Sequence, residues 1–212
     1  MKIETASGLI LRTRPLTETS LIVHWLTPEL GRIATVAKGA RRPKSPFAGK
    51  LDLFYAAEFS FSRSRSSDLH NLREVKLLET HGAIRADILK LQQAAYAANF
   101  IAQATETETP LPEIYGLLRH FIQSLCGETP SAQNVFAFEL KLLRELGQEP
   151  DLADARLTPG AKKIVAALLA GDARLKLSAA QVAELRDWLH GFLIFHLERL
   201  PRGRAAALAV DG

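Results

Sequence analysis

The chain has 212 residues and a mass of 23.3 kDa, which suits one large domain or two small ones. Hydrophobic residues make up 47% and charged residues 24%, as in ordinary soluble globular proteins, so disorder along the whole chain is not expected. The single cysteine, Cys126, excludes an internal disulfide, a cysteine-based zinc site and an iron–sulfur cluster. With no long apolar run and no recognisable signal peptide, the sequence predicts a cytoplasmic protein without a membrane span.

The net charge of +4 is unevenly distributed along the chain. Residues 1–80 contain 13 Lys and Arg against eight Asp and Glu, a net charge of +5, so the remainder carries −1. This asymmetry suggests that the first third of the chain meets a polyanion. The alternative is a chance excess of positive charge without a partner.

Alternating hydrophobic and polar residues predict five strands in the first 80 residues. The expected ranges are 5–14, 18–27, 32–38, 51–61 and 69–78. Five short strands in this length fit a small OB-fold barrel, although the pattern alone leaves a sandwich open. Aromatic residues in these strands can stack nucleic-acid bases or fill the barrel core, and we favour the core. They are Trp25, Phe54, Tyr55, Phe59 and Phe61.

After residue 81 the hydrophobic period becomes helical. A first apolar stripe includes Ile84, Ile88 and Ala98, and a second helix follows the prolines at 110 and 112. Three further helices are expected to begin after the N-cap residues Ser131, Thr158 and Ser178, and the tail after Pro201 is expected to be frayed. The predicted fold is therefore α+β, with a five-stranded OB-fold barrel over 1–80 and an all-α helical domain over 81–212.

The sequence lacks the common patterns of catalytic and metal sites. The only Gly-Lys pair, Gly49-Lys50, has Lys44 where a P-loop needs its first glycine. There is no HExxH pattern, and His190 and His196 are six residues apart, which does not place them together on a helix. We therefore expect a protein that is not an enzyme and that requires no metal or cofactor.

A basic segment lies between the third and fourth predicted strands. Lys38, Arg41, Arg42 and Lys44 bring four cations into seven residues, and Gly39 and Pro43 indicate a turn. Arginine and lysine on such a turn can reach phosphates, which releases counterions from a nucleic acid. The segment is our main candidate for DNA binding, and a solvated loop is the alternative. Arg14 and Arg32, on predicted strands, are further candidates.

Several spaced elements in this region resemble the N-terminal region of the RecO family of bacterial recombination mediators. These elements are Glu18-Thr19-Ser20-Leu21, Thr27-Pro28-Glu29, Gly31-Arg32, Ala37-Lys38-Gly39-Ala40-Arg41, Ser45, Leu51 and Phe54. Phe138-Glu139-Leu140, Leu143, Leu146-Gly147 and Pro150 are similar to the family's helical domain. The resemblance covers about residues 5–150. Beyond them, only the helical pattern is shared with the family.

The resemblance implies an OB-fold that binds single- and double-stranded DNA and anneals complementary strands. It also implies association with the bacterial nucleoid. The implied partners are RecR and the C-terminal tail of single-stranded DNA-binding protein (SSB). Together with these partners, members of the family load RecA onto single-stranded DNA. Arg119, Lys141 and Arg144 are the candidates for contact with the acidic tail. Many RecO proteins carry a four-cysteine zinc module after the Leu-Gly element. Here Ala155 stands about where its first cysteine is expected, so that module is lost or replaced.

Two other classes of function remain open at this point. One is a helical adaptor whose β-domain binds a protein and whose charge is incidental. The other is an RNA-binding OB-fold module without annealing activity. Salt-dependent DNA binding separates the adaptor from the nucleic-acid binders, and competition between DNA and RNA separates the latter two.

Overall fold

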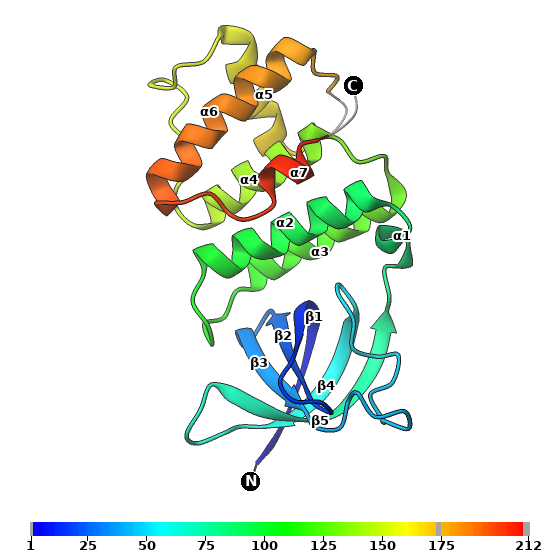
Figure 1. Ribbon diagram of the computed structural model, residues 1–212. Helices are drawn as coiled ribbons and strands as arrows, with labels where there is room; N and C mark the ends of the chain where they lie inside the picture. Colours follow the sequence, from blue (N-terminus) through cyan, green and yellow to red (C-terminus); the bar gives the residue numbers. More distant parts are fainter. Residues whose placement is uncertain (1, 173–174, 210–212) are drawn as a thin grey trace. The chain divides into compact units, whose positions relative to one another are not determined.

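The computed structural model describes residues 2–172 and 175–209 (Figure 1). The chain divides into two compact units. Unit 1 comprises residues 1–82 and 105–122, and unit 2 comprises residues 83–104 and 123–212. Segment 105–122 therefore packs with the N-terminal unit, although it lies inside the range expected for the helical domain. The domain limits at 80 and 81 stay a prediction.

Unit 1 contains a closed five-stranded barrel, which confirms the predicted α+β class and is consistent with an OB-fold. The strands are β1 (Ile3–Pro15), β2 (Leu21–Thr27), β3 (Gly31–Ala37), β4 (Ala56–Ser62) and β5 (Leu69–Glu79). Their order around the barrel is β1-β2-β3-β5-β4, with β1 also paired to β4. All neighbours are antiparallel except β3 and β5, whose parallel pairing spans only Ala34–Val36 and Leu69–Asn71.

The barrel core is aromatic. Trp25 stacks on Phe59 with ring centroids 4.0 Å apart, and the Trp25 indole Nε1–H donates to Thr35 Oγ1 at 2.9 Å. Phe54 and Phe61 are likewise buried, while Tyr55 is half-buried against the same cluster. The preference for core over base stacking is confirmed for Trp25, Phe59 and Phe61, which belong to the buried core cluster of the barrel. Phe54 is buried outside that cluster.

The turn between β2 and β3 is tied to segment 105–111. Gly31 has a φ of +63°, and a Cβ at this position would stand 1.7 Å from the Thr109 carbonyl oxygen, so only glycine fits. The Leu111 N–H donates to the Pro28 carbonyl at 3.0 Å, and the Glu108 N–H donates to the Arg32 carbonyl at 2.9 Å. These bonds explain why residues far along the sequence belong to unit 1.

The helices are α1 (Gly82–Arg85), α2 (Ile88–Ala104), α3 (Pro112–Gly127), α4 (Ala132–Glu145), α5 (Pro159–Ala170), α6 (Ala179–Leu197) and α7 (Arg204–Ala207). The predicted N-caps are confirmed. Ser131, Thr158 and Ser178 each accept a backbone N–H, and Ser178 forms a capping box with Gln181. None of the described helices is long and apolar enough to cross a membrane.

The first predicted helical stripe is partly wrong. The helix breaks before Ile88, where Asp87 Oδ1 accepts the Leu89 N–H at 2.8 Å and thereby caps the start of α2. Ile88 is 69% exposed, whereas Tyr96 and Phe100 are buried. The buried face of α2 therefore differs from the predicted apolar stripe. It includes a polar residue, Gln93, which a hydrophobic pattern does not select.

The expectation of a frayed tail after Pro201 is wrong for the residues that the structure describes. Arg204, in α7, is 5% exposed and its guanidinium donates from Nε to Glu139 Oε1 at 2.6 Å and from Nη2 to Oε2 at 3.1 Å. The Tyr96 hydroxyl donates to the same carboxylate at 2.5 Å. This fully buried carboxylate on α4 therefore ties α2 and α7 to α4, which a hydrophobic pattern does not reveal.

Candidate nucleic-acid interface

The basic loop, residues 38–44, is an exposed series of tight turns. Its four cations, Lys38, Arg41, Arg42 and Lys44, are all exposed. The Arg42 N–H donates to the Gly39 carbonyl at 3.1 Å, and Gly39 has a φ of +70°. A Cβ at Gly39 would meet Arg42 Cδ at an ordinary 3.6 Å, so the backbone angle rather than space requires this glycine.

The loop is anchored to the turn that joins β1 and β2. The Arg41 N–H donates to the Thr19 carbonyl at 3.0 Å, and Arg41 Nη1 donates to the Thr17 carbonyl at 3.1 Å. This turn begins directly after β1, so the basic loop and the end of β1 are held at one place on the barrel. The anchoring lowers the conformational freedom that the loop would lose on binding a ligand.

A second group of cations lies on the outer face of the adjoining strands. Arg12 lies opposite His24 in the β1–β2 register, and Arg14, two residues further along β1, points to the same face. Arg32 is two residues from Ala34, the β3 neighbour of His24. We call these four residues the cationic strip: Arg12, Arg14, His24 and Arg32.

The cationic strip raises the local positive potential. Burial lowers the pKa of the half-buried His24 imidazole, and the positive charges of Arg14, Arg12 and Arg32 lower it further. An anion bound beside His24 would raise the pKa of its imidazole. Three guanidinium groups thus lie close enough to His24 on the barrel surface to disfavour its protonated form.

Arg32 differs from the other predicted DNA contacts because it is half-buried and its guanidinium has two internal hydrogen bonds. It donates from Nε to Thr105 Oγ1 at 2.8 Å and from Nη2 to the Thr105 carbonyl. It is half-buried, and burial lowers its pKa. Arg14, by contrast, is exposed. Arg32 thus supplies charge and holds segment 105–111, while Arg14 and the basic loop present their side chains to solvent.

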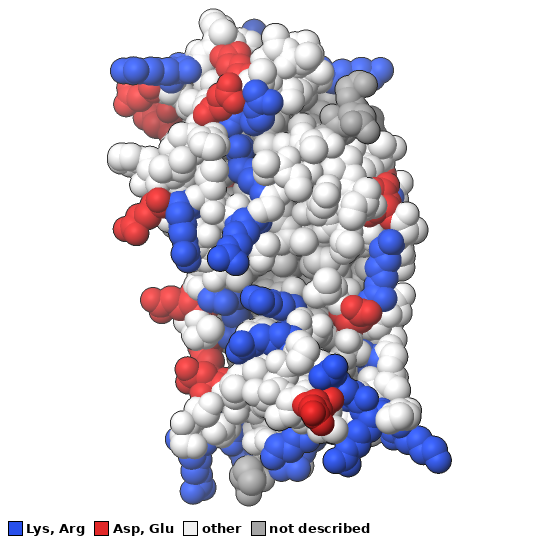
Figure 2. Space-filling view, in the orientation of Figure 1, with Lys and Arg blue, Asp and Glu red and all other residues white. Residues whose placement is uncertain are grey.

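Sequence reasoning missed Arg12 and His24. The signal for Arg12 was present, because residues two apart in a strand share a face and Arg14 had been selected. The position of His24 required the strand register, which the sequence pattern does not determine. Figure 2 shows the resulting prevalence of Lys and Arg over Asp and Glu in the lower part of the view, where the barrel lies.

The segment 105–122 reduces the charge of unit 1. It contributes one Arg and three Glu, so the net charge falls from +5 for residues 1–80 to +3 for unit 1, and unit 2 carries the remaining +1. One of these acids has partners away from the basic loop. Glu108 pairs with Arg63 at 2.8 Å and with His70 at 3.0 Å, which neutralises the rim near the β4–β5 loop rather than the basic loop.

The three predicted partner-binding cations are divided between the two units. Arg119 is exposed on the part of α3 that belongs to unit 1, whereas Lys141 and Arg144 lie on α4 in unit 2. Arg144 Nη1 donates to the Leu169 carbonyl at 3.2 Å in the last turn of α5. Burial, and then the charge of Arg144, lower the pKa of Lys141. Cations at a helix C-terminus stabilise its unpaired carbonyls, which gives Arg144 a structural role.

Unit 2 has an apolar groove along α6. Trp188 and Phe192 pack in a tilted arrangement with ring centroids 5.7 Å apart, and Phe195 is 82% exposed. The groove has a volume of about 920 Å³, and its rim carries three carboxylates and one guanidinium: Asp151, Asp154, Asp187 and Arg156. Among the residues that the structure describes, no cluster of three or more metal-ligating side chains occurs.

Comparison with known proteins agrees with the resemblance noted in the sequence. Residues 1–81 match the family model "Recombination protein O N terminal", and residues 85–155 match "Recombination protein O C terminal". Similar proteins, each named DNA repair protein RecO, occur in Rhodopirellula baltica, with 34% identity over 143 residues, and in Exiguobacterium sibiricum, with 32% over 151 residues. The protein from Symbiobacterium thermophilum is 34% identical over 155 residues.

These alignments cover 68%, 71% and 72% of this chain and 53%, 59% and 60% of the respective relatives. The chain thus spans little more than half the length of the curated relatives that it matches. The two family models nevertheless follow one another in order and together cover nearly all of residues 1–155. The chain therefore belongs to the recombination protein O (RecO) family.

Proposed function

We propose that this protein acts in DNA repair by binding single- and double-stranded DNA through unit 1 and annealing complementary strands. The observation that carries the proposal is the basic loop, whose four exposed cations are held next to the cationic strip on one side of a barrel. The names of the relatives support the repair role. Exposed Lys and Arg on an anchored loop bind phosphates independently of base sequence.

Annealing needs no covalent chemistry in this mechanism. Two complementary strands repel each other through their phosphates, and a surface that binds both lowers that repulsion. Because phosphate contacts carry no sequence information, the bases stay free to pair. The protein then acts as an electrostatic template rather than as an enzyme, and no cofactor takes part.

Strand annealing of two complementary oligonucleotides, one of them fluorescently labelled, tests the proposal. We expect the full-length chain to accelerate annealing, with and without SSB on the strands, and we expect binding to weaken with salt. If about four phosphates are neutralised, log K against log[salt] has a slope of roughly −3 on single strands. A slope near zero, or no acceleration, would contradict the proposal.

Competition with RNA separates this function from that of an RNA-binding module. Unlabelled DNA and RNA strands of the same sequence and length are titrated against a labelled DNA strand. We expect DNA to compete at least as well as RNA, because phosphate contacts do not require the 2′-hydroxyl. Stronger competition by RNA, without annealing, would favour the RNA-binding alternative.

A second candidate function is protein docking by unit 2, and the exposed aromatic groove favours it. RecR and the SSB tail are the partners that family membership suggests, and loading of RecA is the proposed outcome. The acidic rim of the groove is unfavourable for an acidic tail, since like charges would face each other. If the tail binds there, its apolar residues must provide the affinity.

A labelled peptide with the sequence of an SSB tail, titrated onto the full-length chain, tests this docking. Phe195→Ala is expected to weaken saturable binding at least about fivefold, because exposed aromatic anchors dominate such contacts. Asp154→Asn is expected to tighten it slightly. Ile88→Ala removes another exposed apolar residue, 69% exposed and outside the groove, and serves as the control. Equal weakening by Ile88→Ala and Phe195→Ala would count against the groove.

A further inference from the structure

The closed barrel has a seam beside the basic loop, where the pairing between β3 and β5 is short. Pairing between β3 and β5 covers only three residue pairs and ends at Val36 and Asn71. Beyond this point β5 pairs with β4 on one side and, among the described residues, with no strand on the other. The chain that follows the basic loop covers the gap, and Phe47 from this chain is 6% exposed and packs into the barrel core.

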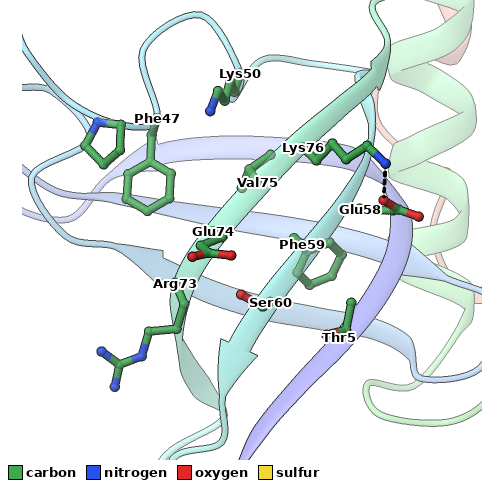
Figure 3. Close-up of a pocket in the computed structure, with 11 residues that line it drawn as sticks. Thr5, Phe47, Lys50, Glu58, Phe59, Ser60, Arg73, Glu74, Val75 and Lys76 are labelled. Carbon is green, nitrogen blue, oxygen red and sulfur yellow. Dashed lines mark hydrogen bonds and ion pairs between the residues drawn. The ribbon is translucent and has the colours of Figure 1, made fainter.

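The seam contains a pocket of about 410 Å³, a size typical of small-ligand sites. The loop and the core-facing residues of β4 and β5 form its floor with three almost fully buried side chains: Phe47, Phe59 and Val75. Figure 3 shows Phe47 and Lys50 reaching the pocket from the loop, opposite the side chains of β4 and β5. Most of the lining residues that a ligand can reach are therefore polar.

Polar groups line the outer side of the same pocket in one row across three strands. Thr5 lies opposite Ser60 in the β1–β4 register, and Ser60 lies opposite Glu74 in the β4–β5 register. The register shifts between Ser60 and Phe61, so that Arg73 is the extra residue of a β-bulge. The bulge directs Arg73 away from the other lining residues (Figure 3).

The two carboxylates of the pocket differ in their availability. Glu58 Oε2 is paired with Lys76 Nζ at 3.0 Å, as the dashed line in Figure 3 indicates. Glu74 is exposed and, among the described residues, has no ion-pair partner within the pocket. The Glu74 carboxylate can therefore accept hydrogen bonds from a ligand, while the Ser60 and Thr5 hydroxyls can donate.

We propose that this pocket binds one unstacked base of a single DNA strand held by the basic loop, with a preference for bases that carry an exocyclic amino group. The proposal rests on the DNA-binding function proposed above and names a recognition site within it. A carboxylate accepts from the N4 amino group of cytosine, whereas thymine offers no amino group. The hydroxyls of Ser60 and Thr5 donate to the ring nitrogen or carbonyl beside it.

The distance between the phosphate-binding residues and the pocket fits a single strand. Lys44 and Phe47 are three residues apart, which limits their separation to about 10 Å. A stacked strand covers this distance in about three nucleotides at 3.4 Å each. Lys50, at the rim of the pocket, provides a further cation for the phosphate of the inserted nucleotide.

Two labelled homopolymers, (dC)15 and (dT)15, titrated onto the full-length chain at one salt concentration, test the proposal. They carry the same number of phosphates, so the ratio of their affinities reports on the bases. We expect (dC)15 to bind at least about fivefold more tightly, since a good base contact contributes ~1–3 kcal/mol. Glu74→Ala is expected to bring the ratio close to one, and Ser60→Val to reduce it.

Glu29→Ala is the matched control, because Glu29 is exposed on the turn between β2 and β3 and does not line the pocket. It removes the same charge and should raise both affinities alike, leaving the ratio unchanged. Circular dichroism verifies that each variant is folded. A ratio near one in the unmodified protein, or a ratio that Glu74→Ala leaves intact, overturns the proposal while DNA binding stands.

Failure of both oligonucleotides to bind would instead overturn the DNA-binding function, and this inference with it. An open strand edge can also accept an extended peptide as an added strand. If that is the role of the seam, the ratio of the two affinities is one in every variant. The outcome therefore distinguishes a base pocket from a peptide-binding edge.

Discussion

The cations of the basic loop and the buried Arg204 of unit 2 have opposite environments. Lys38, Arg42 and Lys44 are exposed on turns, and Arg41 bonds only backbone carbonyls. Arg204, by contrast, is buried and forms two charge-assisted hydrogen bonds with one carboxylate. The comparison teaches that a count of Lys and Arg does not locate a binding surface. A cation is available to a ligand where the fold leaves its side chain exposed and not paired with a carboxylate.

The largest effect on stability is expected when the buried ion pair between Arg204 and Glu139 is broken. Arg204→Ala leaves the Glu139 carboxylate uncompensated in the core of unit 2, so the free energy of unfolding should fall by ~3–5 kcal/mol. Urea denaturation followed by circular dichroism measures the change. Arg202→Ala, at an exposed arginine two residues earlier, should cost no more than ~0.5 kcal/mol. Equal midpoints for the two variants would show that the buried pair does not stabilise unit 2.

The next effect is expected when the basic loop is reversed in charge. Changing Lys38, Arg41 and Arg42 together to Glu takes the loop, with Lys44, from +4 to −2. DNA affinity should fall at least about a hundredfold and annealing should be abolished, because phosphates are then repelled. Stability should change by no more than ~0.5 kcal/mol for each exposed site. Electrophoretic mobility shift and annealing assays measure the result.

A triple reversal at exposed cations of unit 2, Lys163, Lys176 and Arg202 to Glu, makes the same change in net charge. It should leave annealing largely intact if the location of the charge matters. Equal losses in the two triple variants would mean that only the overall charge counts. A large drop in the thermal midpoint of the loop variant would instead show that these residues are structural.

A smaller effect is expected at the exposed part of the cationic strip. Arg12→Gln together with Arg14→Gln removes two potential phosphate contacts, so the salt slope on single strands should become less negative by about 1.4. Affinity at low salt should fall several-fold. Fluorescence anisotropy at four or five salt concentrations gives both quantities. An unchanged slope would restrict the phosphate contacts to the basic loop.

The smallest effect is expected from the titration of His24. Its pKa in the free protein is lowered by burial and by Arg14, Arg12 and Arg32, and bound phosphates would raise it. The complex then binds more protons than the free protein. DNA affinity should therefore rise as pH falls below neutral, and this gain should be lost as pH rises through the raised pKa of the complex.

If DNA binding raises the pKa of His24 by one unit, DNA affinity can gain up to about tenfold. We expect a gain of several-fold between pH 8 and about pH 6. Binding measured at constant ionic strength gives the profile. His24→Gln should flatten it, while His120→Gln, at an exposed histidine on α3, should not. A profile that His24→Gln leaves unchanged would place the titrating group elsewhere.

Much of the fold followed from local patterns. Alternation located all five strands, and the caps at Ser131, Thr158 and Ser178 lie where hydroxyl groups precede apolar stripes. The errors occurred where a polar residue is buried by a distant partner. Arg204 was placed in a frayed tail because its partner, Glu139, is 65 residues away in the sequence.

The candidate nucleic-acid interface could be predicted from the sequence in part. The four loop cations could be selected because Gly39 and Pro43 predict an exposed turn, and the structure leaves them exposed. The distinction between Arg14 and Arg32 could not be made. It depends on Thr105, which the sequence gives no reason to place beside β3.

The sequence by itself determined the order of five strands followed by helices, the helix caps, and that the excess positive charge lies in the first 80 residues. These properties depend on hydrophobic period, turn residues and composition, which are local. Only the tertiary structure decided which cations stay available and where the seam between β3 and β5 opens. Those properties depend on pairing between segments distant in sequence, since a buried or hydrogen-bonded side chain is defined by its partner and not by its neighbours along the chain.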